Sequence, residues 1–220
     1  MKGVYNLNPS QPRYVTTWDT EDVFTFLKKW SPIKNLNISQ ISMKLAMLIL
    51  LITGHRGQSL IALNILNMKV NKSNYEFIIS NKDLKQGRPG YKPETIKLKA
   101  YPVDRRLCVY TYMKAYLDKT ENVRGSTTQL FLTLKKPYKG VSRDTISRWL
   151  KNVLRLSGID ITHFKPGSTR AASTSKASQE GASIDELLKA AGWSNESTFV
   201  KYYKKQVLNK KSMADFVLKQ

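Results

Sequence analysis

Residues 51–60, LITGHRGQSL, place an arginine in a glycine-flanked turn directly after a strongly apolar segment. In that segment apolar residues recur at helical spacing, namely Ile41, Leu45, Leu48, Ile49 and Ile52. Ser39 is a candidate N-cap for such a helix, and Gly54 is a candidate end. The pattern therefore predicts a helix that stops just before Arg56, followed by another short helix.

The chain before this helix divides into a polar arm and a first helix. Residues 1–16 carry Asn, Pro, Ser and Gln without apolar periodicity, which is typical of an arm or linker. The fold is expected to begin near Trp18, where Asp19 or Thr20 can cap a helix with an apolar face of Val23, Phe24, Phe26 and Leu27. Because 220 residues suffice for one core but are few for two, we expect one domain over residues 17–220.

A hairpin is predicted after the short helix. The segments YEFIIS (75–80) and ETIKLKAYP (94–102) flank NKDLKQGRPGYKP (81–93), a polar turn region rich in Gly, Pro and Lys. The rest of the chain has helical patterns at 106–119, 144–158, 183–192, 197–207 and 211–219. A Ser183/Glu186 capping box and Gly192 bound the third of these. The predicted class is α+β, mainly helical, with a small antiparallel sheet.

The charge balance indicates a polyanionic partner. The chain has 37 Lys and Arg against 16 Asp and Glu, a net charge of +21, which favours nucleic acid. A lysine-rich surface without a specific ligand and an anionic membrane surface are the alternatives.

The cysteine content and the absence of targeting patterns indicate the compartment. One cysteine, Cys108, and no signal-peptide pattern or long apolar run favour a reducing, intracellular location without a membrane partner.

Three segments in order carry a family resemblance: LITGHRGQSL (51–60), GSTRAASTSKA (167–177) and AGWSNESTFVKYYKK (191–205). In this order they resemble the catalytic domain of the tyrosine recombinases, or phage-integrase-like enzymes, and look most like those of DIRS-type retroelements. The resemblance covers roughly residues 17 to 206. It implies a site-specific recombinase that cleaves and rejoins DNA through a 3′-phosphotyrosine, without a metal or cofactor.

The resemblance assigns the phosphate clamp to Arg56 and Arg170 and the nucleophile to Tyr203. Guanidinium groups stay charged and grip phosphate oxygens bidentately, which suits a pentacoordinate transition state. A surface salt bridge is the alternative for either arginine alone. Tyr202 is the alternative nucleophile, because Phe199 reaches both tyrosines at helical spacing and either ring can be core.

The resemblance also assigns a general acid and an indole donor. Lys85, in the predicted hairpin turn, is the candidate that protonates the leaving 5′ oxygen, with Lys82 in reserve; plain phosphate contact is the alternative. Trp193 occupies the position where an indole N–H donates to a phosphate oxygen, and a core tryptophan is its alternative. Further DNA contacts are expected from Lys82, Arg88, Arg143, Lys165 and Lys176.

The sequence departs from the family pattern at three places. Gly167 stands where the family has a histidine three residues before the second arginine, and Ser59 stands where many members have an acid. His163 is a candidate replacement, although a structural role is the alternative. The third departure is that residues 1–16 are too few for the amino-terminal domain that closes around DNA.

Three hypotheses follow from the matches and the departures. The first is an active recombinase, and the second is a DNA-binding module of the same fold without chemistry. The third is an unrelated basic protein, which predicts that Arg56, Arg170 and Tyr203 do not converge. The expected partner is double-stranded DNA, on which the family forms tetramers with the last helix docked onto a neighbour; without DNA we expect a monomer. The expected location is nuclear for a eukaryotic mobile element and cytoplasmic otherwise.

Overall fold

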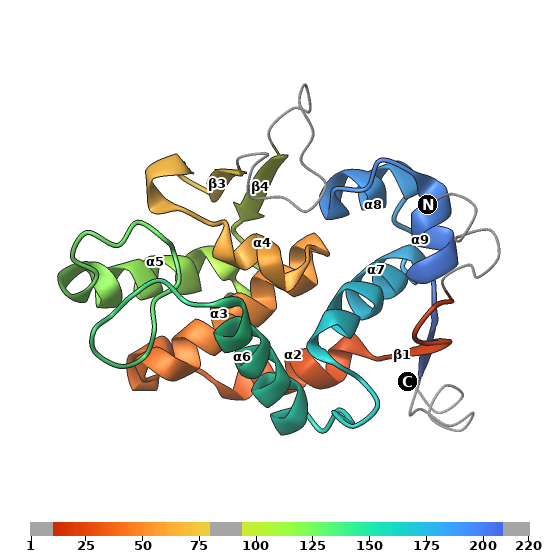
Figure 1. Ribbon diagram of the computed structural model, residues 1–220, viewed down its shortest axis with the longest axis horizontal. Helices are drawn as coiled ribbons and strands as arrows, with labels where there is room; N and C mark the ends of the chain where they lie inside the picture. The colour runs from red at the N-terminus through yellow and green to blue at the C-terminus, as the bar shows by residue number, and fades with distance from the viewer. Residues whose placement is uncertain (1–10, 80–93, 209–220) are drawn as a thin grey trace, which may run out of the picture.

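The computed structural model describes residues 11–79 and 94–208 and is mainly helical (Figure 1). Its helices are α2 (Thr20–Lys29), α3 (Ile38–Thr53), α4 (Gly57–Ile61), α5 (Val109–Thr120), α6 (Arg143–Leu156), α7 (Thr169–Gln179), α8 (Ile184–Ala191) and α9 (Glu196–Tyr202). The strands are β1 (Thr16–Trp18), β2 (Met68–Val70), β3 (Asn74–Ile79), β4 (Glu94–Lys99) and β5 (Gln206–Leu208). The predicted α+β, mainly helical class with a small antiparallel sheet is confirmed.

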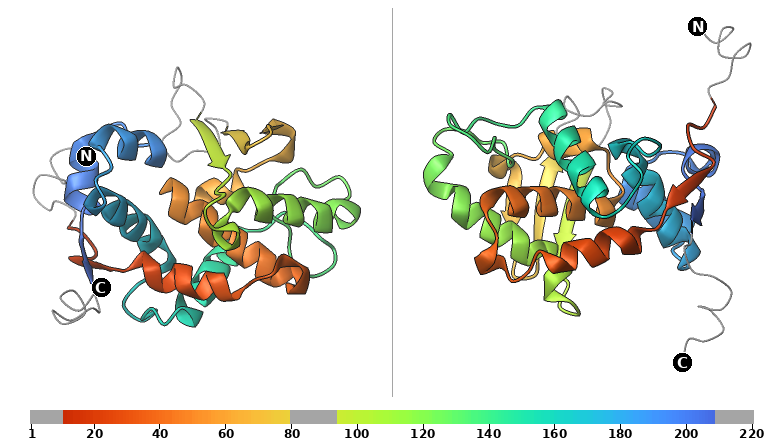
Figure 2. Two further views of the ribbon diagram at one scale, coloured as in Figure 1. Left: turned by 180° about the vertical axis from the view of Figure 1, so that it is seen from behind. Right: turned by 90° about the horizontal axis from the view of Figure 1, so that it is seen from below.

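Helix α3 forms the centre of the main core. Every residue from Ile41 to Leu51 is buried, and the helix packs against α5, α6 and α7 (Figure 2). Asn37 caps its start in a capping box with Gln40, so the prediction that Ser39 is the cap is wrong. The reason is that Asn37 has the extended backbone of a cap, whereas Ser39 already lies in the first turn. Gly54 ends the helix in the left-handed conformation, as predicted.

Lys44 is a fully buried lysine in the middle of α3. Its Nζ donates to the carbonyls of Leu27 and Trp30 and contacts the Tyr112 hydroxyl, each at 2.7 Å. The ammonium thereby satisfies carbonyl groups at the carboxyl end of α2, where a helix has acceptors without intrahelical partners. Burial lowers the pKa of Lys44 to about 7.

We expect Lys44→Met to destabilise the fold by about 1–3 kcal/mol, because the two carbonyls lose a buried donor. The difference in unfolding free energy between the wild type and Lys44→Met should grow between pH 7 and pH 9. In that interval Lys44 is protonated in the unfolded chain but largely neutral in the fold, so the wild-type protein gains stability as the pH rises. Denaturant unfolding at both pH values measures this, with the exposed Lys114→Met as the control. An equal difference at both pH values would contradict the expectation.

The antiparallel sheet has the order β2–β3–β4. In its register Tyr75 lies opposite Leu98 and Phe77 opposite Ile96, and all four side chains are buried. The alternating apolar positions of the two predicted strands therefore form the inner face of the sheet. The predicted hairpin is confirmed for its strands, whereas its turn, residues 80–93, lies outside the described residues.

A second, parallel sheet joins the two ends of the described chain. Strand β1 pairs with β5 at the end of the molecule away from the antiparallel sheet (Figures 1 and 2). The prediction of one helix over 197–207 is therefore wrong, because α9 ends at Tyr202 and the chain continues as a strand. The indole N–H of Trp18 also donates to Ser168 Oγ at 2.9 Å, which fixes β1 next to the start of α7.

The other predicted helices occur with shifted boundaries. Helix α8 has the predicted Ser183/Glu186 capping box and ends at Gly192. It forms a small separate core with α9, made of Leu187, Ala191, Trp193 and Phe199. The helix expected at 211–219 lies outside the described residues, and the proposed division into residues 1–16 and 17–220 stays a prediction.

Candidate active site

A cavity of about 380 Å³ lies between the end of α3, α4, α6 and the start of α7. Its walls include His55, Arg56, Arg143, Gly167, Arg170 and Tyr203. Three of these side chains carry a fixed positive charge, and none of the described lining residues is Asp or Glu. A wall of this composition favours an anion with several oxygens, such as a phosphate group.

Arg56 occupies the cap position of α4, where its extended backbone turns the chain out of α3. From this turn its Nη2 donates to the Tyr203 hydroxyl at 3.3 Å. The two residues are separated by 147 positions in the chain, so the contact depends on the tertiary fold and not on local spacing. A guanidinium at this distance stabilises a phenolate and remains able to bind a phosphate oxygen.

Arg170 lies in the first turn of α7 and is only 4% exposed. Its Nη1 donates to the Gly54 carbonyl at 2.8 Å, and its guanidinium carbon lies 4.1 Å from the centre of the Trp193 ring. A Cβ at Gly54 would lie 2.9 Å from Thr174 Cγ2, so only glycine allows this approach of α3 to α7. The glycine therefore sets the position of Arg170 as well as the end of the helix.

Tyr203 and Tyr202 have different surroundings. Tyr203 lines the cavity, whereas Tyr202 is not among its described lining residues and contacts the Lys201 ammonium at 5.3 Å from its ring centre. Ser175 on α7 holds the chain at this point, because its Oγ donates to the Tyr203 carbonyl at 2.6 Å and accepts from the Lys205 N–H at 2.9 Å. Sequence reasoning missed Ser175, since a serine in a helix carries no such signal.

Trp193 packs against two neighbouring aromatic rings. It is 7% exposed and packs against Tyr203 and Phe199, with ring centres 4.8 and 5.4 Å apart. Its indole N–H is buried and has no hydrogen-bond partner among the described residues. A donor in this state is available to a bound group, as the indole prediction requires, while the ring body belongs to the small core.

His55 is a cavity residue that the sequence prediction missed. It is 5% exposed, and its Nδ1 lies 3.4 Å from Ser59 Oγ, so Ser59 takes part in the site through this side chain. Burial and the positive charges of Arg170 and Arg56 lower the pKa of His55 to about 4. The imidazole is therefore neutral at pH 7. Its position next to Arg56 in LITGHRGQSL was the available signal.

Gly167 and His163 differ in their relation to the cavity. Gly167 is part of the cavity wall, and a Cβ built on it would meet nothing within 4 Å, so the position where a histidine is usual is open here. His163 is exposed and packs on the rings of Tyr14 and Phe164, with ring centres at 5.7 and 4.5 Å. His163 is not among the described lining residues of the cavity.

The predicted DNA-contact residues have three kinds of surroundings. Arg143 is exposed at the cavity wall, at the start of α6. Lys165 donates to the carbonyls of Ile161 and Thr162, and Lys176 forms an ion pair with Glu180 at 2.8 Å. Lys82, Lys85 and Arg88 lie outside the described residues. The role of every predicted site residue stays a prediction.

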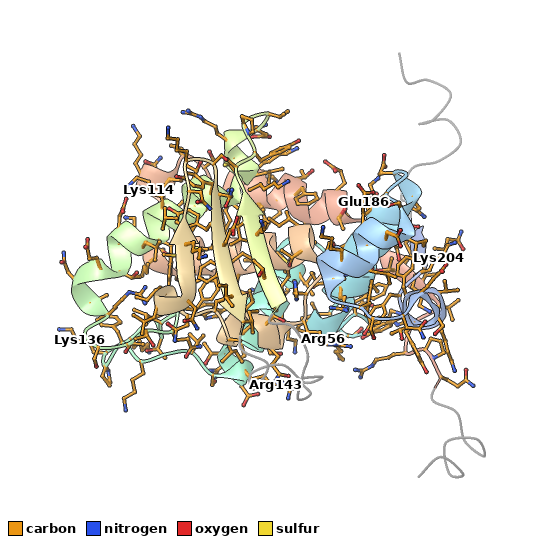
Figure 3. All side chains as sticks on the ribbon, turned by 90° about the horizontal axis from the view of Figure 1, so that it is seen from above. Arg56, Lys114, Lys136, Arg143, Glu186 and Lys204 are labelled. Carbon is orange, nitrogen blue, oxygen red and sulfur yellow. The ribbon has the colours of Figure 1, made fainter. Side chains whose placement is uncertain are left out.

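Positive side chains also lie outside the cavity. In Figure 3, Arg56, Arg143 and Lys136 lie in the lower half of the view, whereas Lys114 lies in the upper half. Within residues 11–79 and 94–208, no helix is long and apolar enough to cross a membrane. The same residues contain no cluster of three His, Cys, Asp or Glu side chains suited to a metal ion.

Comparison with known proteins identifies relatives of this arrangement. Residues 17–208 match the family model described as the Phage integrase family. No curated protein matches the chain. The XerH site-specific recombinase bound to its difH substrate has a TM-score of 0.64 at 16% identity, over 88% of this chain and 50% of that chain. XerA recombinase has a TM-score of 0.64 at 20% identity, over 94% and 64%.

A lambda integrase dimer bound to a COC′ core site is also similar, with a TM-score of 0.54 at 14% identity over 97% of this chain and 69% of that chain. At these identities the likeness shows the fold, which is that of a tyrosine recombinase catalytic domain. The chain spans half the length of the XerH chain. The hypothesis of an unrelated basic protein is wrong, because Arg56, Arg170 and Tyr203 line one cavity.

Proposed function

Because the chain belongs to the phage integrase family, we propose that it is a site-specific DNA recombinase that works through a 3′-phosphotyrosine. One observation carries the proposal: Arg56, Arg170 and Tyr203 come from three separate segments and line one cavity. The Arg56 guanidinium lies within hydrogen-bond distance of the Tyr203 hydroxyl. The site therefore combines a nucleophile with two fixed cations, as phosphoryl transfer requires.

In the proposed reaction the Tyr203 oxygen attacks the scissile phosphorus while the bond to the 5′ oxygen breaks. Arg56 and Arg170 hold the non-bridging oxygens and offset the charge that develops on them. The leaving 5′ oxygen takes a proton from Lys85, the candidate acid that the family resemblance indicates. Attack by a 5′ hydroxyl of another strand reverses the step, so the phosphodiester is rejoined without an external energy source.

The second candidate function is a DNA-binding module without chemistry. Gly167 favours it, because the cavity wall has no side chain where a histidine is usual in the family. The two functions share the positive cavity and differ only in whether a covalent bond to DNA forms.

Covalent capture tests the proposal without knowledge of the target site. The protein is incubated with nicked duplexes of randomised sequence, in which the short fragment beyond the cleavage point diffuses away and traps the intermediate. Denaturing electrophoresis then shows a protein–DNA adduct for a recombinase, and sequencing of the trapped strands gives the preferred site. Binding without any adduct would favour the non-catalytic module.

Arg143 is expected to contribute to DNA affinity through phosphate contact, because it lies exposed at the cavity. We expect Arg143→Ala to lower the slope of log affinity against log salt by about one, since one fewer phosphate is neutralised. Lys114→Ala removes the same charge from a residue that is not among the described lining residues of the cavity and should leave the slope unchanged (Figure 3). Fluorescence anisotropy over a salt series measures both, and equal slopes for the two variants would contradict the expectation.

The finer assignments complete the proposal. On DNA we propose a tetramer, and in its absence a monomer, which light scattering with and without duplex distinguishes. The motif resemblance to DIRS-type retroelements favours a mobile element as the source of the DNA site. For a eukaryotic element this would place the reaction in the nucleus.

A further inference from the structure

Helix α7 is hydrogen-bonded to the segments that carry both Arg56 and Tyr203. On one side, Ser173 Oγ donates to a carbonyl in the last turn of α3, and Arg170 Nη1 donates to the Gly54 carbonyl at 2.8 Å. These carbonyls lie shortly before Arg56, which begins α4. Figure 1 shows α7 between α4 and α9. A residue fixed to α7 is therefore fixed relative to both arginines of the site.

On the other side, α7 contacts the segment of Tyr203 through Ser175. The Ser175 Oγ donates to the Tyr203 carbonyl at 2.6 Å and accepts from the Lys205 N–H at 2.9 Å. The hydroxyl thus uses its donor and one acceptor position on the backbone of one short segment. Because Ser175 is only 1% exposed, water does not compete for these two hydrogen bonds.

Tyr203 lies where the chain leaves α9, so its carbonyl depends on a donor from outside the helix. Its N–H still donates to the Phe199 carbonyl at 2.8 Å, but its backbone, with φ −124 and ψ −24, ends the helix. The last carbonyls of a helix have no intrahelical partner. Ser175 supplies the missing donor. Through the N–H of Lys205 it also fixes the direction in which the chain continues into β5.

The backbone of Tyr203 determines where its hydroxyl lies. The ring centre is 4.8 Å from that of Trp193 and 5.2 Å from the guanidinium carbon of Arg170. The hydroxyl is 3.3 Å from Arg56 Nη2, which is long for a hydrogen bond, so a small displacement breaks it. Reacting atoms must approach to about 3–3.5 Å, and a misplacement of about 1 Å can cost about 100-fold in rate.

We propose that Ser175 is a positioning residue for the nucleophile. Its two hydrogen bonds fix the backbone of Tyr203 to the helix that carries Arg170, so that the attacking hydroxyl stays next to Arg56 and the bound phosphate. The proposal rests on the recombinase function proposed above. Since Ser175 acts through Tyr203 and not on the DNA, it affects the rate of attack and not the affinity for the duplex.

The test compares Ser175→Ala with a buried serine that is not among the described lining residues of the cavity. Ser42 is 0% exposed on α3, and its Oγ donates to the Ile38 carbonyl at 2.7 Å, so Ser42→Ala removes a similar buried hydroxyl. One measurement is the single-turnover rate of adduct formation with saturating nicked duplex obtained by covalent capture. The other is the fluorine NMR resonance of a fluorotyrosine placed at position 203, which needs neither DNA nor activity.

We expect Ser175→Ala to slow adduct formation by about 10- to 100-fold at unchanged DNA affinity, because the hydroxyl of Tyr203 loses its fixed position. The fluorine resonance should shift or broaden in the same variant. Ser42→Ala should change neither the rate nor the resonance. Ser175→Cys keeps a side chain of similar shape with a weaker donor, so its rate should lie between those of the wild type and Ser175→Ala.

Three results would overturn the assignment while the proposed function stands. They are a wild-type adduct rate in Ser175→Ala, a slower rate with an unchanged resonance, and an equal loss of rate in Ser42→Ala. If Ser175→Ala fails to fold, a wild-type rate in Ser175→Cys overturns it in the same way. Absence of any adduct with the wild-type protein would instead overturn the proposed function, and the resonance would then show separately whether Ser175 holds Tyr203.

Discussion

Tyr203→Phe is expected to abolish covalent attachment to DNA completely, while Tyr202→Phe forms adduct at the wild-type rate. The reason is geometric: the Tyr203 hydroxyl lies in the cavity, 3.3 Å from Arg56 Nη2. Tyr202 is not among the described residues of the wall. Removal of the hydroxyl from Tyr203 takes away the attacking oxygen and leaves the ring packed on Trp193, so the fold and the cavity persist.

The measurement is denaturing electrophoresis after incubation with the captured nicked duplex, with DNA affinity measured in parallel. Tyr203→Phe should bind DNA like the wild type, because the positive wall is intact. Adduct in Tyr203→Phe but not in Tyr202→Phe would show that Tyr202 is the nucleophile. Adduct in both single variants and none in the double variant would mean that either tyrosine can attack.

The choice between these tyrosines shows where sequence reasoning stops. Both follow Phe199 at helical spacing, and a continuous helix places them on neighbouring parts of one face. In the structure α9 ends at Tyr202, and Tyr203 leaves the helical path with φ −124 while Ser175 holds its carbonyl. The orientation of the ring thus depends on a contact from α7, 28 positions earlier, which local periodicity does not encode.

Local signals in the sequence predicted the fold well where local forces determine it. The Ser183/Glu186 capping box begins α8 and Gly54 ends α3, as the capping side chains and the backbone freedom of glycine predict. The pairing of β1 with β5 was missed, since three-residue strands from opposite ends of the chain have no recognisable pattern. Lys44 has no local signal of its role, because its ammonium reaches the carboxyl end of α2, 17 positions earlier in the chain.

The sequence predicted only part of the candidate site. Motif order identified Arg56, Arg170, Trp193 and Tyr203, and the structure brings these four side chains together. His55 was missed because the family pattern directs attention to the position now held by Gly167. The residues that line the other walls of this cavity come from separate segments of the chain, so only the tertiary structure identifies them.

Arg170→Lys is expected to slow adduct formation by about 100- to 1000-fold, the usual cost of removing one fixed donor from a transition state. Lysine keeps the positive charge, so DNA affinity should change little, but it lacks the planar fork that holds the Gly54 carbonyl and a phosphate oxygen at once. Arg170→Ala should be worse, because it also leaves that buried carbonyl without this donor and opens space beside Trp193. Single-turnover rates with saturating duplex separate chemistry from binding, and Lys114→Ala controls for charge. If Arg170→Lys reacts at the wild-type rate, Arg170 acts as a plain positive charge and the clamp depends on Arg56.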